Sequence, residues 1–342
     1  MGVFKVGVIG SGNFGLAIAN ILTHNNEVLL YARSKTNADL INNKREIKGS
    51  KINEKITATN DLKEVAKSCK LIFMFVPSSF FKDMLVDISE FLTPEHIVIH
   101  GTKGLHLDLN IDEVDSLKKE EVFTMSELIL RETSVIRVGC LAGPNLASEI
   151  NAGQIAGTVI ASRFNEVIKE GKKALNCPLF KVYGSNETIS VELASVLKNY
   201  IAIASGMLSG MGFGDNSKSL LITRGMAEMI YFGKAMGTSE KAFLGLAGIG
   251  DLVATCNSKL SRNFRVGYFL AQGKKMDEIL EELGEVAEGV KTIKIVKLLA
   301  RYNFNSPIAD TLYKIVYEDW GIKEGMEYLM NLPVNYDADY VD

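Results

Sequence analysis

The stretch Val6-Gly7-Val8-Ile9-Gly10-Ser11-Gly12-Asn13-Phe14-Gly15 decides the fold of this chain. It places a Gly-x-Gly-x-x-Gly pattern directly after an apolar strand and before a helical pattern over Leu16 to Leu22. In such a pattern the first glycine permits a tight turn, the second lets the backbone approach a pyrophosphate, and the third lets the helix pack closely. The helix N-terminus adds N–H donors and the positive end of its dipole. We therefore predict a dinucleotide-binding, Rossmann-type domain whose cofactor contacts are Gly10, Ser11, Gly12, Asn13, Phe14 and Gly15.

The end of the second predicted strand, Glu27 to Tyr31, bears on the choice between NAD and NADP. A carboxylate there hydrogen-bonds the ribose 2'-hydroxyl of NAD, whereas basic groups accommodate the 2'-phosphate of NADP. Here the chain continues Ala32-Arg33-Ser34-Lys35, and no acid follows until Asp39. An arginine fork suits a phosphate dianion. We predict NADPH/NADP as the cofactor and Arg33 as a contact of its 2'-phosphate. Two alternatives stay open: the protein also uses NADH/NAD, or Arg33 only stacks on the adenine ring.

The first half of the chain continues to alternate strands and helices, which predicts a parallel sheet with helices on its faces. Strands are expected at Phe4–Ile9, Glu27–Tyr31, Leu71–Val76, Ile97–His100, Ile136–Leu141, Ala156–Ala161 and Leu179–Tyr183. The charged, amphipathic region from Asp108 to Thr133 is interpreted as the solvated face of a helix.

After Ser185 the β-branched runs disappear and helical periodicity persists almost to the end. Helices are expected at Ser217–Met236, Arg262–Gln272, Met276–Leu283, Ala287–Tyr302 and Ile308–Trp320. We therefore predict an α/β protein with an N-terminal, Rossmann-type, mostly parallel sheet domain over residues 1–186, followed by an all-α substrate-binding domain over residues 187–332. A mobile tail is expected over residues 333–342.

The composition excludes several classes of partner. The 38 basic and 41 acidic residues give a net charge of −3, so the chain offers no basic field for nucleic acid, and small molecules are the expected partners. The four cysteines are far apart and the four histidines show no ligand spacing, so we expect neither disulfides nor a metal site. The N-terminus carries no secretory leader pattern. A cytoplasmic protein is the resulting expectation.

The loops after the third, fourth and fifth predicted strands are expected to frame the nicotinamide, because open parallel sheets bind ligands at the carboxyl ends of their strands. These loops begin at Pro77, Gly101 and Ala142. We predict Pro77 as a cofactor contact. Lys103, which lies between glycines, is a candidate cation of the same site, with a solvated surface lysine as the alternative.

A second candidate cation, Lys198, is the only charged residue between Leu193 and Met211. The alternative is a lysine whose apolar stem is buried while its ammonium reaches water. The run is also about as long as a membrane span, but a central lysine would cost roughly 2.5–3.5 kcal/mol in the bilayer. We therefore expect no stable membrane insertion. A desolvated ammonium can transfer protons near neutral pH, and we interpret Lys198 as such a group on a helix packed against the first domain.

Two segments downstream add partners for this lysine. Asp251 follows Gly248-Ile249-Gly250 at a predicted helix start, where it either serves as a helix N-cap or orients the Lys198 ammonium. Ser261, Arg262 and Asn263 then begin another helix. A cap hydroxyl, first-turn N–H groups, a guanidinium and an amide are typical of a phosphate-binding turn.

At this point the chain resembles the NAD(P)-dependent glycerol-3-phosphate dehydrogenases over nearly its whole length. The stretches that carry the resemblance are Gly10 to Gly15, Gly101-Thr102-Lys103-Gly104-Leu105, Gly143-Pro144, Leu197-Lys198-Asn199, Gly212-Phe213-Gly214-Asp215-Asn216, Thr223-Arg224-Gly225, Gly248 to Cys256, Ser261-Arg262-Asn263 and Glu288-Gly289. The resemblance implies reversible reduction of dihydroxyacetone phosphate, a small phosphorylated three-carbon substrate, to sn-glycerol 3-phosphate. It also implies supply of glycerophospholipid synthesis by a cytoplasmic homodimer.

The resemblance also implies roles for individual residues. The family's proton acceptor in the oxidising direction falls on Lys198, and with it the catalytic set comprises Lys103, Asp251 and Thr255. Substrate contacts fall on Lys103, Gly143, Asn145, Lys198, Asp251, Ser261, Arg262 and Asn263. Further cofactor contacts fall on Asn13, Phe14, Arg33, Lys103, Ala147, Arg262, Val286 and Glu288.

One position departs from the bacterial members of this family, which usually carry serine or threonine where this chain has Asn145; here it is more similar to the eukaryotic branch. Two other functions remain as alternatives. One is another two-domain, lysine-dependent reductase of the 3-hydroxyacid or 6-phosphogluconate dehydrogenase type, although Asn199 directly follows the lysine here. The other is a non-catalytic NADPH-binding regulator.

Overall fold

The computed structural model describes residues 5–284, 287–299 and 306–333, and its chain divides into two compact units. The first unit comprises Met1–Gly104 and Phe123–Thr188, and the second comprises Leu105–Val122 and Ile189–Asp342. The chain thus leaves the first unit at Gly104, contributes residues 105–122 to the second, and returns.

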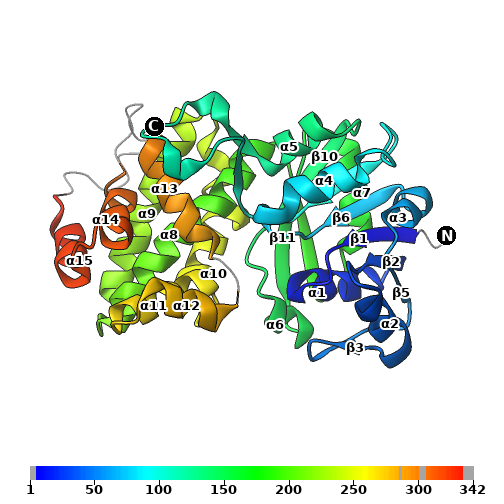
Figure 1. The fold of residues 1–342 in the computed structure, drawn as a ribbon, viewed down its shortest axis with the longest axis horizontal. Helices are drawn as coiled ribbons and strands as arrows, with labels where there is room; N and C mark the ends of the chain where they lie inside the picture. The colour runs from blue at the N-terminus through cyan, green and yellow to red at the C-terminus, as the bar shows by residue number, and fades with distance from the viewer. Residues whose placement is uncertain (1–4, 285–286, 300–305, 334–342) are drawn as a thin grey trace. The chain divides into compact units, whose positions relative to one another are not determined.

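The first unit is built on an eight-stranded sheet with the order β12-β11-β10-β7-β6-β1-β2-β5. Neighbouring strands are parallel except for β10 and β11, which are antiparallel. Figure 1 shows helices lying along this sheet. The strands are β1 (Lys5–Ile9), β2 (Glu27–Tyr31), β5 (Ile56–Thr59), β6 (Leu71–Met74), β7 (Ile97–His100), β10 (Arg137–Ala142), β11 (Ala156–Ala161) and β12 (Phe180–Ser185), with shorter strands at β3 (Glu46–Ile47), β4 (Ser50–Lys51), β8 (Leu105–Leu107) and β9 (Val122–Thr124).

Both faces of the sheet are buried, because successive side chains of a strand point to opposite faces. Val8 belongs to the apolar cluster on one face and Ile9 to the cluster on the other. The first face is covered by α1 (Asn13–Leu22), α2 (Lys35–Lys44), α6 (Ala147–Asn151) and α7 (Asn165–Leu175). The second is covered by α3 (Leu62–Ser68), α4 (Phe81–Ser89) and α5 (Met125–Glu132). The predicted Rossmann-type, mostly parallel sheet is confirmed.

Two departures from the prediction concern strand β5 of this unit and the segment that precedes α5, most of which belongs to the second unit. The edge strand β5 was missed, because four residues with mixed burial give a weak pattern. The prediction of a helix face over Asp108 to Thr133 is wrong except for α5. The rest of that region contains two short 3-10 turns, at Ile111–Glu113 and Lys119–Glu121, among extended backbone. Its charges reflect exposure to water rather than a helical face.

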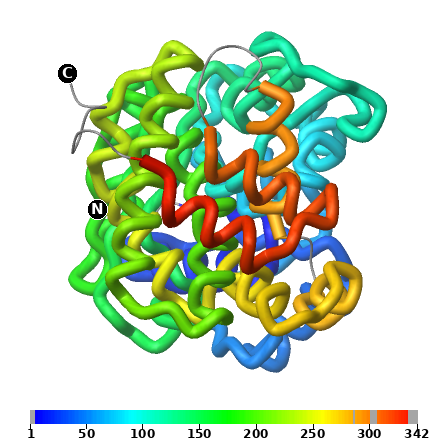
Figure 2. Tube along the Cα trace, turned by 90° about the vertical axis from the view of Figure 1, so that its left-hand side faces the viewer, coloured from blue at the N-terminus to red at the C-terminus, as the bar shows by residue number. Residues whose placement is uncertain are grey.

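The second unit is helical, as predicted. Its helices are α8 (Thr188–Gly210), α9 (Asp215–Ala235), α10 (Asp251–Asn257), α11 (Arg262–Ala271), α12 (Met276–Leu283), α13 (Glu288–Leu299), α14 (Pro307–Tyr317) and α15 (Ile322–Asn331). Figure 2 shows α13, α14 and α15 as orange-to-red segments, and α14 packs against both of the others. The expected mobile tail lies, from residue 334 onward, outside the described residues.

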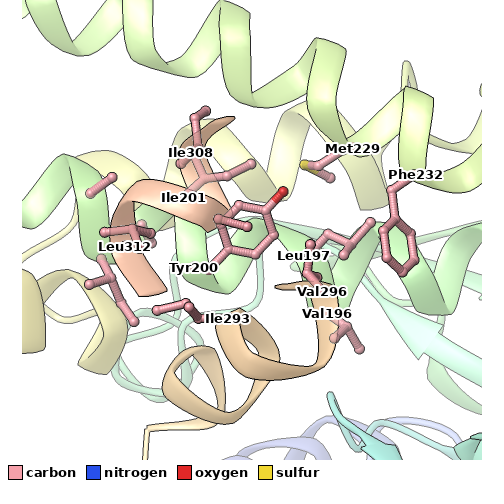
Figure 3. Close-up of a cluster of buried hydrophobic side chains, with 14 of the residues drawn as sticks. Val196, Leu197, Tyr200, Ile201, Met229, Phe232, Ile293, Val296, Ile308 and Leu312 are labelled. Carbon is pink, nitrogen blue, oxygen red and sulfur yellow. The ribbon is translucent and has the colours of Figure 1, made fainter. Parts of the chain in front are cut away.

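Helix α8 forms the centre of this unit. Its Val196, Leu197, Tyr200 and Ile201 lie among apolar side chains of α9, α13 and α14 (Figure 3). Within the described part of the chain, α8 alone is long and apolar enough to cross a membrane, and its apolar window is entirely buried inside the protein. Its composition is therefore accounted for by the helices packed around it.

Small residues let α11 approach α8 closely. A Cβ on Gly206 would lie 2.0 Å from the carbonyl oxygen of Phe264, and one on Gly267 would lie 1.8 Å from that of Ile203. No side chain fits at such distances, so the glycine spacing in α8 serves a contact between two helices of this unit. This contact fixes the start of α11 beside the lysine-bearing helix.

One buried carboxylate joins three of these helices. Glu228 of α9 is 3% exposed and accepts hydrogen bonds from the backbone N–H groups of Ile308 (2.8 Å) and Ala309 (3.1 Å) in the first turn of α14. The hydroxyl of Tyr200, from α8, donates to the same carboxylate at 2.9 Å. Burial raises the pKa of Glu228 from 4.5 to about 7, although these three donors oppose the shift.

This raised pKa predicts how stability depends on pH. A carboxyl whose pKa is higher in the folded state binds its proton more tightly there, so its contribution is complete below pH 4.5 and is lost as the pH rises through about 7. We expect the free energy of unfolding to fall less over this interval in Glu228→Gln than in the wild type. Denaturant titrations at several pH values measure this difference. The exposed Glu54→Gln is the matched control, and a Glu228→Gln profile parallel to the wild type would contradict the assignment.

Candidate active site

The predicted phosphate loop has the geometry that its glycines require. Gly10 has φ +119°, and a Cβ there would lie 2.4 Å from the carbonyl oxygen of Phe75. A Cβ on Gly15 would lie 2.0 Å from the carbonyl oxygen of Gly10. A Cβ on Gly12 would meet no atom within 4 Å. Gly12 is the N-cap residue of α1, and it has no side chain that could accept a hydrogen bond from the first turn of the helix. The loop thus combines open space at Gly12 with the N-terminus of a ten-residue helix, which fits a dinucleotide pyrophosphate.

The loop that carries Lys103 is fastened to the neighbouring strand end. The hydroxyl of the buried Thr102 donates to the carbonyl of Val76 at 2.6 Å, and the N–H of Gly101 donates to the carbonyl of Met74 at 2.9 Å. A Cβ on Gly101 would lie 2.6 Å from the ring of Phe75. Since β6 and β7 are parallel neighbours, these contacts hold Lys103 at the carboxyl end of the sheet.

Phe14 and Phe75 form an aromatic pair at the same end of the sheet. Their rings meet edge to face, with centroids 5.1 Å apart. Phe14 is the second residue of α1, and Phe75 follows the last residue of β6. Pro77, two residues after Phe75, is the exposed N-cap of a 3-10 turn over Ser78–Phe80. Phe75, which contacts Phe14 and Gly10 of the glycine loop, therefore connects this loop with the segment that leads to Pro77.

The loop after β10 is also at the carboxyl end of its strand. Gly143 has φ +151°, a conformation that favours glycine. The side-chain amide of Asn145 donates to the carbonyl of Gly157 at 2.8 Å, while its buried Oδ1 has no hydrogen-bond partner among the described residues. Ala147 is the first residue of α6. Asn145 thus fastens its loop to β11, a contact that serine or threonine would be too short to copy.

Arg33, Ser34 and Lys35 are exposed at the end of β2. Ser34 is the N-cap of α2, and its hydroxyl oxygen accepts a hydrogen bond from the N–H of Asn37 at 3.1 Å. Two cationic side chains therefore flank the N-terminus of a ten-residue helix. This is an electropositive position at the end of the strand where the nucleotide's ribose is expected.

In the second unit, Lys198 forms a buried network with two residues of α10. Lys198 is 3% exposed, and its Nζ lies 3.1 Å from Oδ1 of Asp251, which is also 3% exposed. Nζ also donates to the hydroxyl of Thr255, and that hydroxyl donates to the carbonyl of Asp251 at 2.6 Å. The alternatives of an ammonium reaching water and of Asp251 as an N-cap are both wrong, because the ammonium is buried and Gly250 occupies the N-cap position.

The start of α10 places these partners on one face. A π-helical turn over Leu246–Gly250 leads directly into α10, and Asp251 and Thr255 stand four residues apart, as neighbours on a helix surface do. At the other end of α10, the carbonyl of Cys256 accepts a hydrogen bond from the Ser205 hydroxyl of α8 at 2.8 Å. Burial raises the pKa of the Cys256 thiol to about 12, so it stays neutral beside the ion pair.

The predicted phosphate-binding turn opens α11. Ser261 is its N-cap, and the Ser261 hydroxyl oxygen accepts from the N–H of Phe264 at 3.3 Å. Arg262 is exposed and Asn263 is half-buried. The Oδ1 of Asn263 accepts a hydrogen bond from the N–H of Gly289 at 3.0 Å. Glu288 precedes Gly289 as the first residue of α13, while the predicted cofactor contact Val286 lies outside the described residues.

Gly289 connects this turn to the lysine. A Cβ on Gly289 would lie 2.6 Å from Oδ1 of Asn263 and 2.9 Å from the carbonyl oxygen of Asn199, the residue after Lys198. The structure therefore brings Lys198, Asp251, Thr255, Asn263 and Glu288 into one region of the second unit. The other predicted contacts belong to the first unit, at the carboxyl ends of its strands; they are the glycine loop, Pro77, Lys103, Gly143, Asn145 and Ala147. Among the described residues no cluster of three metal-ligating side chains occurs.

Three residues that fasten the candidate site residues, one in the first unit and two in the second, were not assigned a role from the sequence. Thr102 lies in a predicted loop and Ser205 in the predicted apolar helix, but a hydroxyl that donates to a distant carbonyl leaves no pattern in the sequence. Gly289 belongs to a stretch that carries the family resemblance, yet its contact with Asn263 spans 26 residues of chain. Only the pairing of α11 with α13 reveals it.

The arrangement in the second unit suits a reaction at the carbonyl group of a compound that also carries an anionic group such as a phosphate. A buried ammonium can stabilise and protonate a developing alkoxide, because hydrogen bonds and charges act more strongly where water is excluded. The opening turn of α11 supplies N–H groups and a guanidinium suited to a phosphate. In the first unit, the open position at Gly12 suits a dinucleotide.

Comparisons with known proteins agree with a dinucleotide-dependent enzyme that acts on a phosphorylated compound. The family models described as the NAD-dependent glycerol-3-phosphate dehydrogenase N-terminus and C-terminus match residues 5–168 and 187–327. Curated relatives named glycerol-3-phosphate dehydrogenase [NAD(P)+] include one from Alcanivorax borkumensis, 38% identical over 97% of this chain and 95% of its own length, and one from Acinetobacter baylyi, 39% identical over 92% and 86%.

Solved structures are similar as well. The glycerol-3-phosphate dehydrogenase of Coxiella burnetii has a TM-score of 0.85 at 27% identity, covering 96% of this chain and 99% of its own. That of Plasmodium falciparum has a TM-score of 0.84 at 26% identity, covering 98% and 97%. On this evidence the chain belongs to the NAD(P)-dependent glycerol-3-phosphate dehydrogenase family, a family of oxidoreductases.

Proposed function

We propose that this protein catalyses the reversible reduction of dihydroxyacetone phosphate to sn-glycerol 3-phosphate with NADPH. The observation that carries the proposal is the buried Lys198–Asp251–Thr255 network. Gly289, whose N–H donates to Asn263, packs against the backbone of Asn199, the residue after Lys198. The proposed dinucleotide-binding domain is residues 1–186 and the proposed substrate-binding domain is residues 187–332, with some contacts of each ligand supplied by the other half of the chain. The product would supply glycerophospholipid synthesis.

The residues that would hold the dinucleotide are the glycine loop Gly10 to Gly15, Arg33, Pro77, Lys103 and Ala147, with Arg262, Val286 and Glu288 from the second half. The open position at Gly12, where a Cβ would meet no atom, is the observation in favour of their fit. When bound, the reduced nicotinamide supplies a hydride from its C4 to the carbonyl carbon of the substrate.

Lys198 is the proposed proton donor. As the carbonyl carbon gains the hydride, the C=O π-electron pair moves to the oxygen, and Lys198 Nζ gives that oxygen a proton, so the product is an alcohol and a neutral amine. Asp251 offsets the positive charge of the ammonium before the transfer and fixes its position together with Thr255. Lys103 is proposed to stabilise the developing alkoxide by its charge.

The phosphate of the substrate is proposed to bind at the opening turn of α11. The guanidinium of Arg262, the amide of Asn263 and the first-turn N–H groups would hold it. Gly143 and Asn145 are proposed as further substrate contacts from the first half of the chain. Binding energy from this remote group can position the reacting carbonyl, because it is available throughout the reaction.

Activity assays test the proposal directly. We expect purified protein to oxidise NADPH in the presence of dihydroxyacetone phosphate and to form sn-glycerol 3-phosphate in equal amount. Unphosphorylated dihydroxyacetone should react far less efficiently. A protein that binds NADPH but oxidises it with neither compound would instead support a non-catalytic regulator.

The preference for NADPH is proposed from Arg33 and Lys35, which are exposed beside the N-terminus of α2. We expect Arg33→Asp to lower the ratio of kcat/KM for NADPH to that for NADH by about 100-fold, because an ion pair with the 2'-phosphate becomes a repulsion. Steady-state kinetics with both cofactors measure this ratio. The exposed Arg163→Asp makes the same change of charge elsewhere and should leave the ratio unchanged. An unchanged ratio in Arg33→Asp would favour the adenine-stacking alternative.

The proposed working form is a cytoplasmic homodimer, as the family resemblance implies. Light scattering of the purified protein, at concentrations that bracket those of the assay, tests the oligomeric state. A mass of one chain at full activity would contradict the dimer.

A further inference from the structure

The amide of Asn263 has two chemically different ends, and the structure determines which end faces which way. The backbone N–H of Gly289 lies 3.0 Å from one end of the amide. A peptide N–H can only donate, so the end that faces it must be the carbonyl oxygen, Oδ1. The Nδ2 end is therefore directed away from Gly289, and it has no hydrogen-bond partner among the residues that the structure describes.

The partner of Asn263 is itself a strongly polarised donor. Gly289 is the second residue of the twelve-residue helix α13, and the first N–H groups of a helix lack partners within it. Oδ1 of Asn263 satisfies one of them from a different helix, α11. Because this end of α13 carries the positive end of its dipole, an amide turned the other way would bring two N–H donors together. The orientation of Asn263 is thus fixed by the backbone.

Only glycine permits this contact at position 289. The nearest atoms to an added Cβ would be Asn263 Oδ1 at 2.6 Å, the carbonyl oxygen of Asn199 at 2.9 Å and Cδ1 of Ile203 at 2.9 Å. The Asn199 carbonyl belongs to the backbone of α8 and cannot swing aside. A larger residue would therefore displace the Asn263 amide or move α13 away from α8.

We propose that Gly289 is a positioning residue for phosphate selectivity: its N–H holds the oxygen of the Asn263 amide, so that Nδ2 presents only N–H donors to the substrate's phosphate. This inference rests on the proposed function for the identity of the anion. A phosphate dianion accepts hydrogen bonds and donates none, so a fixed donor beside Arg262 selects it. A freely rotating amide would present its oxygen to the phosphate part of the time. The alternative is that the Asn263 side chain only caps the N-terminus of α13 and makes no contact with the phosphate.

Asn263→Asp separates these two possibilities. Aspartate has nearly the shape of asparagine, and one carboxylate oxygen can still accept from the Gly289 N–H, so the cap is kept. The other oxygen, however, replaces the Nδ2 donor by a negatively charged acceptor. If Asn263 only caps α13, both stability and phosphate binding should survive. If Asn263 is the fixed donor, stability should survive while phosphate binding is lost.

Binding of inorganic phosphate, measured by isothermal titration, is the first test because it requires no turnover. We expect the dissociation constant to rise about 100-fold in Asn263→Asp and about 10-fold in Gly289→Ala, since a donor becomes a repelling acceptor in the first and is misplaced in the second. Gly321→Ala is the matched control, because a Cβ there would meet only Glu324 atoms at 3.8 Å or more; it should bind phosphate as the wild type does.

Kinetics give the second readout. We expect the ratio of kcat/KM for dihydroxyacetone phosphate to that for dihydroxyacetone to fall about 100-fold in Asn263→Asp and about 10-fold in Gly289→Ala. Most of this change should be a rise in KM for dihydroxyacetone phosphate. Thermal unfolding within a few degrees of the wild type in Asn263→Asp would show that the cap is retained. Wild-type phosphate affinity in a folded Asn263→Asp or Gly289→Ala would overturn the inference. Wild-type protein that binds phosphate but does not reduce dihydroxyacetone phosphate would overturn the proposed function alone.

Discussion

Lys198→Ala is expected to lower kcat for reduction of dihydroxyacetone phosphate by about 10³-fold or more, because a positioned proton donor and the charge that stabilises the alkoxide are lost together. Affinity for NADPH should change little, since the predicted dinucleotide loop belongs to the other unit. Stopped-flow reduction and fluorescence titration with NADPH measure the two quantities. Turnover within a few-fold of the wild type would contradict the role of Lys198.

The variant leaves Asp251 as a buried carboxylate without its cation, which destabilises a fold strongly. The double variant Lys198→Met with Asp251→Asn removes both charges and keeps the side-chain volumes close to the original. We expect it to fold and still to lack turnover. Lys323→Ala, an exposed lysine of the same unit, controls for the loss of one positive charge.

Arg262→Ala is expected to lower the ratio of kcat/KM for dihydroxyacetone phosphate to that for dihydroxyacetone by about 100-fold or more, because the charge-assisted hydrogen bonds of a guanidinium to a phosphate are lost. Arg262 opens α11 directly after the N-cap Ser261. The first N–H groups of a helix lack partners within it and are suited to an anion. Parallel assays with the two substrates measure the ratio.

The matched control for this variant lies three residues further along the same helix. Arg265→Ala removes a guanidinium that lies 3.9 Å from Glu282 and 5.5 Å from the ring centroid of Phe269. We expect its substrate ratio to equal that of the wild type. A ratio that falls equally in both variants would assign the effect to general charge rather than to a phosphate contact.

Much of the fold could be predicted because its signals are local. A β-branched run followed by spaced glycines predicted β1, its turn and α1, and Ile97–His100 and Met276–Leu283 were predicted with the bounds that the structure shows. The excursion of residues 105–122 into the second unit has no such signal, since it depends on Leu105, Leu117 and Val122 packing into the core around α8. Its charged exposed residues therefore looked like a helix.

The candidate site was predicted in part. A lone charge in an apolar helix drew attention to Lys198, and a glycine turn before an acid drew attention to Asp251; the structure joins them. Cross-helix contacts such as Gly289 with Asn263, or Ser205 with Cys256, depend on how helices pack, and single-residue chemistry does not reveal them. Gly206 and Gly210 pack α8 against α11, and which helix would lie there leaves no local signal in the sequence either.

The transfer of deuterium from C4-dideuterated NADPH tests the central claim most directly. The protein is incubated with this cofactor and dihydroxyacetone phosphate, and the product is examined by mass spectrometry and NMR. We predict sn-glycerol 3-phosphate that carries one deuterium on its central carbon, formed by the wild type and nearly absent with Lys198→Ala. A product without deuterium, or the absence of glycerol 3-phosphate while NADPH still binds, would contradict hydride transfer at this site.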